Sequence, residues 1–88
     1  MEQILVDGHN YYVDTVTDSC DGSEHVEVFD VYHDKVGAAV VDHNTECVNV
    51  YYVETDMSAS YNYFELKEGR EGLMYLAEWI VATDPVIG

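Results

Sequence analysis

Short apolar runs, rich in β-branched and aromatic residues, alternate with turn-forming residues through the first two-thirds of the chain. The segment EHVEV alternates polar and apolar positions, as a half-buried strand does. The breaks contain Gly, Asp, Asn and Ser, including DKVG at 34–37 and DMSAS at 56–60, and these residue types favour turns and loops. The pattern predicts an antiparallel sheet of about four to six strands. The predicted strands cover residues 3–7, 10–18, 24–33, 38–42, 47–55 and 61–67.

The last third of the chain changes to helical periodicity. Apolar residues recur there at the spacing of one helix face, at Leu73, Leu76, Ala77, Ile80 and Val81. We predict a helix from about Arg70 to Ala82, ended by Asp84-Pro85. The whole is one α+β domain over residues 1–88, with strands between about 3 and 66. The expected architecture is a curved antiparallel sheet with the C-terminal helix packed on one face.

Two similar stretches, YYVDT at 11–15 and YYVET at 51–55, occur in the predicted strands. Side chains alternate between the faces of a strand, so Tyr52 is expected to face the helix and Tyr51 to be exposed. In the first copy the same alternation separates Tyr11 from Tyr12 and Asp14. We interpret each stretch as half core and half contact face. Glu54 corresponds to Asp14, but it would need a β-bulge to leave the face of Tyr52.

The charge restricts the function more than any motif. The chain has 18 acidic residues against 3 Lys and Arg, for a formal net charge of −15. Its 48% hydrophobic residues and eight tyrosines distinguish it from a disordered acidic tail. The negative field attracts cations and basic proteins, and it disfavours direct contact with nucleic acid or an anionic membrane.

Cysteine use and hydropathy indicate a cytoplasmic protein. Cys20 and Cys47 are the only cysteines, and the N-terminus has neither a basic start nor a long apolar run. We therefore expect reduced thiols, with a Cys20–Cys47 disulfide as the less favoured alternative. A membrane helix is not expected, because no run of about twenty apolar residues is present.

The motifs of catalysis and metal binding are missing. The histidines lie at His9, His25, His33 and His43, without HxH, HExxH or CxxC spacing. The acidic segment DSCDGSE does not have the ligand spacing of a calcium loop. GxSxG and Gly-rich phosphate-binding motifs do not occur either. We expect neither an enzyme nor a bound cofactor or metal.

Tyrosines and carboxylates together indicate a contact surface. Tyrosine supplies large contact area at protein interfaces, and carboxylates engage the Lys and Arg that normally bind phosphates. The candidate partner-binding residues are Tyr12, Asp14, Asp18, Asp21, Glu24, Tyr51 and Glu54.

Small size, extreme acidity, a β-rich fold and the missing catalytic motifs resemble the phage-encoded inhibitors that mimic nucleic acid. Several anti-CRISPR and anti-restriction proteins belong to this class. The resemblance is one of general character. It implies a protein, acting in the host cytoplasm, that blocks nucleic-acid loading by a host defence nuclease or its complex.

Two other interpretations remain open. An immunity protein or antitoxin that neutralises a basic nuclease toxin would use the same acids and tyrosines. A protein of a salt-loving organism would be acidic and poor in lysine without any partner. The gene of an immunity protein would lie beside its toxin gene, which would distinguish it from an inhibitor. A protein of a salt-loving organism would lose its structure at low salt, whereas an inhibitor would keep it.

Overall fold

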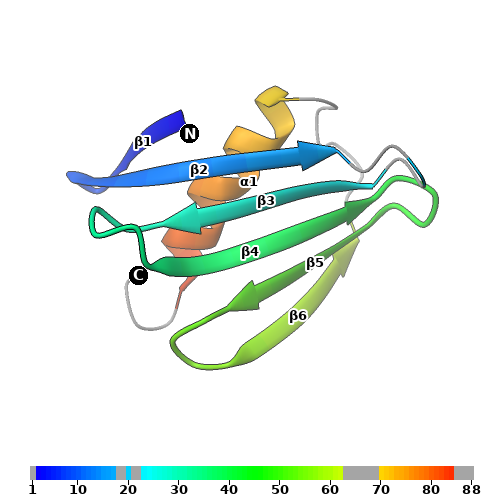
Figure 1. The fold of residues 1–88 in the computed structure, drawn as a ribbon. Coiled ribbons are helices and arrows are strands. Elements are labelled where there is room, and N and C mark those ends of the chain that lie inside the picture. The colour runs from blue at the N-terminus through cyan, green and yellow to red at the C-terminus, as the bar shows by residue number, and fades with distance from the viewer. Residues whose placement is uncertain (1, 18–19, 21–22, 63–69, 85–88) are drawn as a thin grey trace.

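The fold is a six-stranded antiparallel sheet with one helix on one face (Figure 1). The computed structural model describes residues 2–17, 20, 23–62 and 70–84. The strands follow one another in the sheet in chain order, so every strand pairs with its sequence neighbours. The predicted α+β architecture is confirmed. The elements are β1 (Glu2–Val6), β2 (His9–Thr17), β3 (Glu24–Phe29), β4 (Lys35–Asp42), β5 (Cys47–Tyr52), β6 (Met57–Asn62) and α1 (Arg70–Thr83).

The first hairpin is set by a two-residue turn. Asp7 and Gly8 both have positive φ angles, 51° and 83°, and Val6 pairs directly with His9. Two positive φ angles in succession are typical of a type I′ turn, which matches the twist of the flanking strands. Gly and Asp tolerate this conformation better than most residues, so the sequence DG fixes the register of β1 on β2.

The chain turns earlier than predicted after β3. Asp30 Oδ1 accepts hydrogen bonds from the backbone N–H groups of Tyr32 and Asp34, at 2.9 and 3.0 Å. These bonds favour a turn over a ladder, so β3 ends at Phe29 and does not continue to residue 33. The prediction of a turn at 34–37 is wrong for its last three residues, because β4 begins at Lys35.

The sixth strand also begins earlier than predicted. Residues 57–60, predicted to be loop, belong to β6, which pairs with β5 from Met57 to Asn62. This strand lies at the edge of the sheet and is largely exposed, so the alternation of apolar and polar residues in MSASYN is not accompanied by alternating burial. The predicted β5 was too long, because residues 53–56 form the connecting turn. Residues 63–67 of the predicted sixth strand lie outside the described residues.

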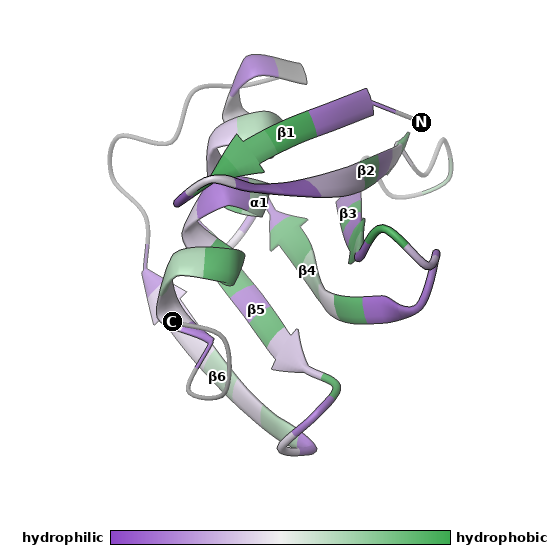
Figure 2. Cartoon of the chain, turned by 90° about the vertical axis from the view of Figure 1, so that its left-hand side faces the viewer, coloured by the Kyte–Doolittle hydropathy of each residue, from purple (hydrophilic) through white to green (hydrophobic). Residues whose placement is uncertain are grey.

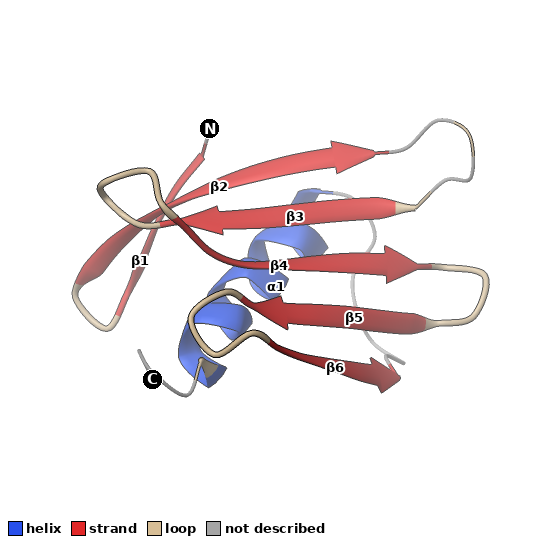
Figure 3. Cartoon of the chain, turned by 60° about the horizontal axis from the view of Figure 1, so that its bottom comes forward, coloured by secondary structure: helices blue, strands red, loops and turns tan. Residues whose placement is uncertain are grey.

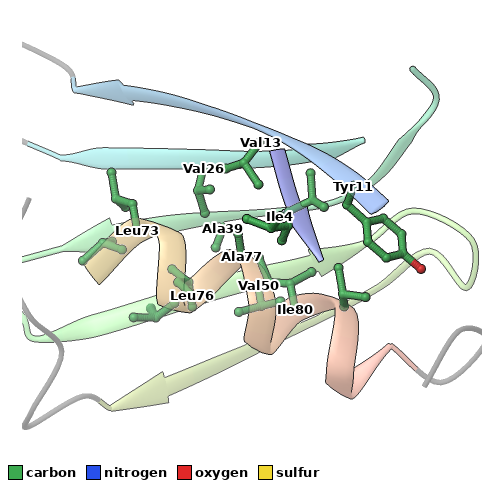
Figure 4. Packing of buried hydrophobic residues seen from close by; sticks show 14 of the residues in the cluster. Ile4, Tyr11, Val13, Val26, Ala39, Val50, Leu73, Leu76, Ala77 and Ile80 are labelled. Atoms are coloured by element: carbon green, nitrogen blue, oxygen red, sulfur yellow. The ribbon is translucent and has the colours of Figure 1, made fainter. Parts of the chain in front are cut away.

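The core lies between α1 and one face of the sheet (Figure 4). All five residues of the predicted helix stripe are buried, which confirms that stripe. In β5 the alternation is also as predicted, with Tyr52 buried and Tyr51 39% exposed. The sheet contributes Ile4, Tyr11, Val13, Val26, Val28, Ala39, Val41, Val48, Val50 and Tyr52.

Glycine permits the close approach of α1 to β4. A Cβ at Gly37 would lie 2.8 Å from Ile80 Cγ2 and 3.0 Å from the Tyr51 carbonyl oxygen. Carbon atoms normally pack at about 3.5–4.0 Å, so only glycine leaves room for Ile80 here. The helix therefore lies directly on the start of β4.

Candidate acidic contact surface

Three turns gather carboxylates at one end of the sheet. Because successive strands run in opposite directions, the β1–β2, β3–β4 and β5–β6 turns lie at the same end, and α1 also finishes there (Figure 3). We call this set of residues the acidic end: Asp7, Asp30, Asp34, Glu54, Asp56 and Asp84. Asp84 is buried, whereas the other five are exposed or half-buried.

The charges of three of these carboxylates act on one core tyrosine. Burial raises the pKa of the Tyr11 phenol, and the charges of Asp84, Asp30 and Asp7 raise that pKa further. These three carboxylates come from the end of α1, the β3–β4 turn and the β1–β2 turn. Carboxylates from segments far apart in the chain therefore disfavour the ionised form of the same phenol.

Two of the carboxylates also stabilise the turns that carry them. Asp30 holds the β3–β4 turn through its two backbone hydrogen bonds. Asp56, with a positive φ of 52°, accepts a hydrogen bond of 2.5 Å from the Tyr51 hydroxyl. This hydrogen bond is the main cause that raises the pKa of Tyr51, ahead of desolvation and the Asp56 charge. The Tyr51 hydroxyl is thus fixed against the β5–β6 turn.

Exposed aromatic residues lie among these acids. Tyr32 in the β3–β4 turn is 81% exposed. Next to it, His33 has a positive φ of 66° and stacks on Tyr12 of β2, with ring centroids 4.9 Å apart and planes inclined by 11°. Large, accessible rings beside carboxylates are suited to contact with a basic protein surface.

The open face of the sheet carries a second, smaller group of charges. Asp14 of β2 lies directly opposite Glu27 of β3. Two carboxylates in this position repel each other. Lys35 Nζ lies 3.1 Å from Glu27 Oε2 and offsets part of that repulsion. Both side chains of the ion pair are over a third exposed, so it contributes only about 0–1 kcal/mol.

The candidate residues that the structure describes lie in three different places. Tyr12, Asp14 and Tyr51 share the open face, with β3 and β4 between Asp14 and Tyr51. Glu54 lies in the β5–β6 turn, so it reaches the surface without the bulge that strand alternation would have required. Glu24 lies near the opposite end of the sheet, where its Oε1 is 2.8 Å from His43 Nε2. Asp18 and Asp21 lie outside the described residues.

Sequence reasoning missed most of the acidic end. Asp7, Asp30, Asp34, Asp56 and the exposed Tyr32 were not among the candidates. The available signal was the alternation of turns, because every second turn of a sequential antiparallel sheet lies at the same end. The first, third and fifth turns all contain Asp.

Three of the histidines and one of the thiols make side-chain contacts in the sheet and its turns. His25 Nε2 lies 3.2 Å from Ser23 Oγ, in addition to the His43 and His33 contacts above. Neither Cys20 nor Cys47 forms a disulfide, and Cys47 Sγ lies 3.4 Å from the Thr45 carbonyl oxygen. Among the residues that the structure describes, no group of three His, Cys, Asp or Glu side chains is placed to hold a metal ion.

The chain matches no protein-family model, no curated protein and no solved structure. Within the described part of the chain, no helix has the length and apolar character needed to cross a membrane.

Proposed function

We propose that this protein is an inhibitor that mimics nucleic acid and occupies the basic groove of a host defence nuclease or its complex. Anti-CRISPR and anti-restriction inhibitors act in this way. The observation that carries the proposal is the acidic end, where separate turns present carboxylates and exposed tyrosine rings together. The proposed partner is therefore a basic nucleic-acid-binding protein.

The spacing of the turns supports a summed electrostatic field. Adjacent strands lie about 4.8 Å apart, so successive turns at the acidic end are offset by roughly 10 Å. That distance is close to the Debye length of about 8–10 Å at 0.1–0.15 M salt. The potentials of neighbouring turns therefore overlap, as those of phosphates do along a nucleic-acid backbone.

The chemistry of the carboxylates also suits a phosphate-binding surface. Arg and Lys that grip phosphates also form charge-assisted hydrogen bonds with carboxylates, and Arg does so in a bidentate manner. Tyr32 adds contact area beside these charges. Hairpin turns and a packed helix hold the carboxylates in place, so less ordering entropy is lost on binding.

Capture followed by competition tests the proposal. The immobilised protein should retain a basic nucleic-acid-binding protein from bacterial lysate, and excess duplex DNA or guide RNA should release it. Association should slow markedly between 50 and 500 mM salt, since steering by charge is screened. A captured partner that nucleic acid does not displace would refute mimicry.

A matched pair of double variants separates the acidic end from the overall charge. Asp34→Asn with Glu54→Gln neutralises two exposed carboxylates of the acidic end. Glu46→Gln with Glu71→Gln removes the same charge from exposed positions elsewhere. We expect the first pair to weaken partner binding at least about tenfold, equal to 1.4 kcal/mol, and the second pair to have a much smaller effect. Equal losses would indicate that net charge alone determines binding.

A further inference from the structure

A hollow of about 370 Å³ lies between β1 and one face of α1. Figure 2 shows β1 passing beside α1, with the hydrophobic second half of β1 next to the helix. The hollow is large enough for a side chain and near the lower limit of small-molecule sites. Its walls include Leu5 and Asp7 on one side and Tyr75, Glu78, Trp79 and Ala82 on the other.

The helix side of the hollow is a stripe separate from the core stripe. Tyr75, Glu78, Trp79 and Ala82 follow the spacing i, i+3, i+4 and i+7, so they share one helix face. Tyr75 and Leu5 are each 65% exposed, although both are large apolar residues. The hollow is therefore a lined surface whose apolar walls remain accessible to a partner.

Trp79 gives the hollow a fixed wall. It is half-buried against the core, and its ring meets that of Tyr61 edge to face, with centroids 4.9 Å apart and planes inclined by 84°. A ring held in this way keeps its remaining surface in one orientation. A ligand that stacks on it loses little entropy in ordering the site.

The walls combine aromatic, acidic and aliphatic side chains, and a single arginine side chain can contact all three. Aromatic faces attract a guanidinium, the carboxylates of Asp7 and Glu78 accept its hydrogen bonds, and Leu5 can cover its aliphatic stem. We propose that the hollow binds an arginine side chain carried by a basic peptide segment. Arginine fits better than lysine, because its guanidinium is planar, stacks on rings and binds carboxylates with two nitrogens.

The charge of the chain decides between occupants. A second copy would bring a formal net charge of −15 against the same sign, and an anionic lipid surface would also be repelled. A basic segment is attracted by both the overall field and the two carboxylates in the walls. The inference rests on the proposed function only for the source of the arginine, which would belong to the inhibited protein.

The position of β1 favours an extended segment. Within the described residues β1 pairs with β2 alone, so it is an edge strand of the sheet. Extended peptides can add to such an edge while their side chains enter neighbouring pockets. The arginine would then be presented to the hollow from a strand beside β1.

Fluorescence of Trp79, the only tryptophan of the chain, tests the inference. Three short peptides of otherwise identical sequence would be titrated, carrying arginine, lysine or citrulline at one position. We expect a saturable change at millimolar arginine peptide, a weaker one with lysine and none with citrulline, which keeps the shape but lacks the charge. No saturation with the arginine peptide, or equal binding of the citrulline peptide, would overturn the proposal.

A single charge removal in the hollow gives the second readout. Glu78→Gln should weaken the arginine peptide about tenfold, since it loses a charge-assisted hydrogen bond. Glu46→Gln removes one charge from an exposed turn residue elsewhere and should change the affinity less than about twofold. Circular dichroism of both variants confirms that they are folded. Equal weakening in the two variants would refute a local site.

The peptide experiment and the capture experiment fail independently. If the arginine peptide binds but no captured partner is displaced by DNA, the arginine site is retained and the proposed function is rejected. A displaceable partner whose affinity is unchanged by Glu78→Gln would retain the function and reject a role for the hollow in it.

Discussion

The contact between Gly37 and Ile80 allows a sharp test of how α1 lies on the sheet. In Gly37→Ala the new methyl carbon would lie 2.8 Å from Ile80 Cγ2, nearly 1 Å inside the normal contact distance. Ile80 is fully buried, so it has little room to move. Overpacking of this kind costs roughly 1–3 kcal/mol, which is a large share of the 5–15 kcal/mol of a typical domain.

A second substitution shows whether Ile80 causes that cost. Ile80→Ala should destabilise the fold by about 2–5 kcal/mol, because it leaves a cavity. It also removes Cγ2, so Gly37→Ala should cost at least about 1 kcal/mol less in that background. Ile80→Val is the matched control, since valine keeps both γ carbons and should leave the cost of Gly37→Ala nearly unchanged. The Tyr51 carbonyl contact at 3.0 Å persists in every background, so the cost should not vanish.

Urea denaturation followed by far-ultraviolet circular dichroism would measure this cycle. The difference of about 1 kcal/mol corresponds to roughly 4–8 °C in melting temperature for a domain of this size. The reasoning would be refuted if Gly37→Ala cost the same, within about 0.3–0.5 kcal/mol, in the Ile80→Ala background as in the original chain. That result would mean that the helix does not rest on β4 at Gly37.

Two further predictions concern the acidic end. Asp30→Ala should lower the free energy of unfolding by roughly 1.5–3 kcal/mol in urea denaturation, because two backbone N–H groups lose their acceptor, whereas Asp30→Asn should cost less. The fold raises the pKa of both Tyr11 and Tyr51 and so favours their neutral forms. The stability that these two raised pKa values contribute is fully present below about pH 10, the pKa of tyrosine in the unfolded chain. It is lost as the pH rises through the higher pKa values of the folded state. The urea midpoint should therefore fall above about pH 10, and Tyr51→Phe should reduce that fall; an unchanged alkaline slope in Tyr51→Phe would contradict the role given to its hydrogen bond with Asp56.

Local patterns predicted the faces of the elements well. Alternation along β5 correctly separated buried Tyr52 from exposed Tyr51, and helical spacing correctly placed Leu76 and Ile80 in the core. Both predictions depend only on the geometry of one element and on the presence of a single core. That information is contained in a short stretch of sequence.

Edges and turns were harder to predict because their environment decides them. The segment MSASYN of β6 alternates apolar and polar residues, but most of it is exposed and its serines are typical of loops, so composition indicated a loop. The strand is defined by pairing with β5. In the β3–β4 turn, the side chain of Asp30 competes with the sheet for backbone hydrogen bonds. Composition alone could not place the boundary between Phe29 and Lys35.

The candidate surfaces depended on strand order, which the sequence pattern did not determine. Asp7, Asp30 and Asp56 come together only because the strands follow one another in chain order. The hollow likewise depends on where α1 crosses the sheet, which brings Tyr75 close to β1. The acidic, tyrosine-rich contact surface stays a prediction, and its described candidate residues lie on the open face, in the β5–β6 turn and near the opposite end of the sheet.

The acidic end links the proposed contact surface to the stability of the core. Asp30 and Asp56 hold their turns by hydrogen bonds, so their removal lowers stability as well as charge. Asp34 and Glu54 are exposed, and their charges add to the repulsion within a strongly acidic domain. Neutralising these two should therefore keep or raise the melting temperature while it weakens partner binding. Opposite changes in the two measurements would separate a contact role from a structural one, because loss of folded protein lowers both together.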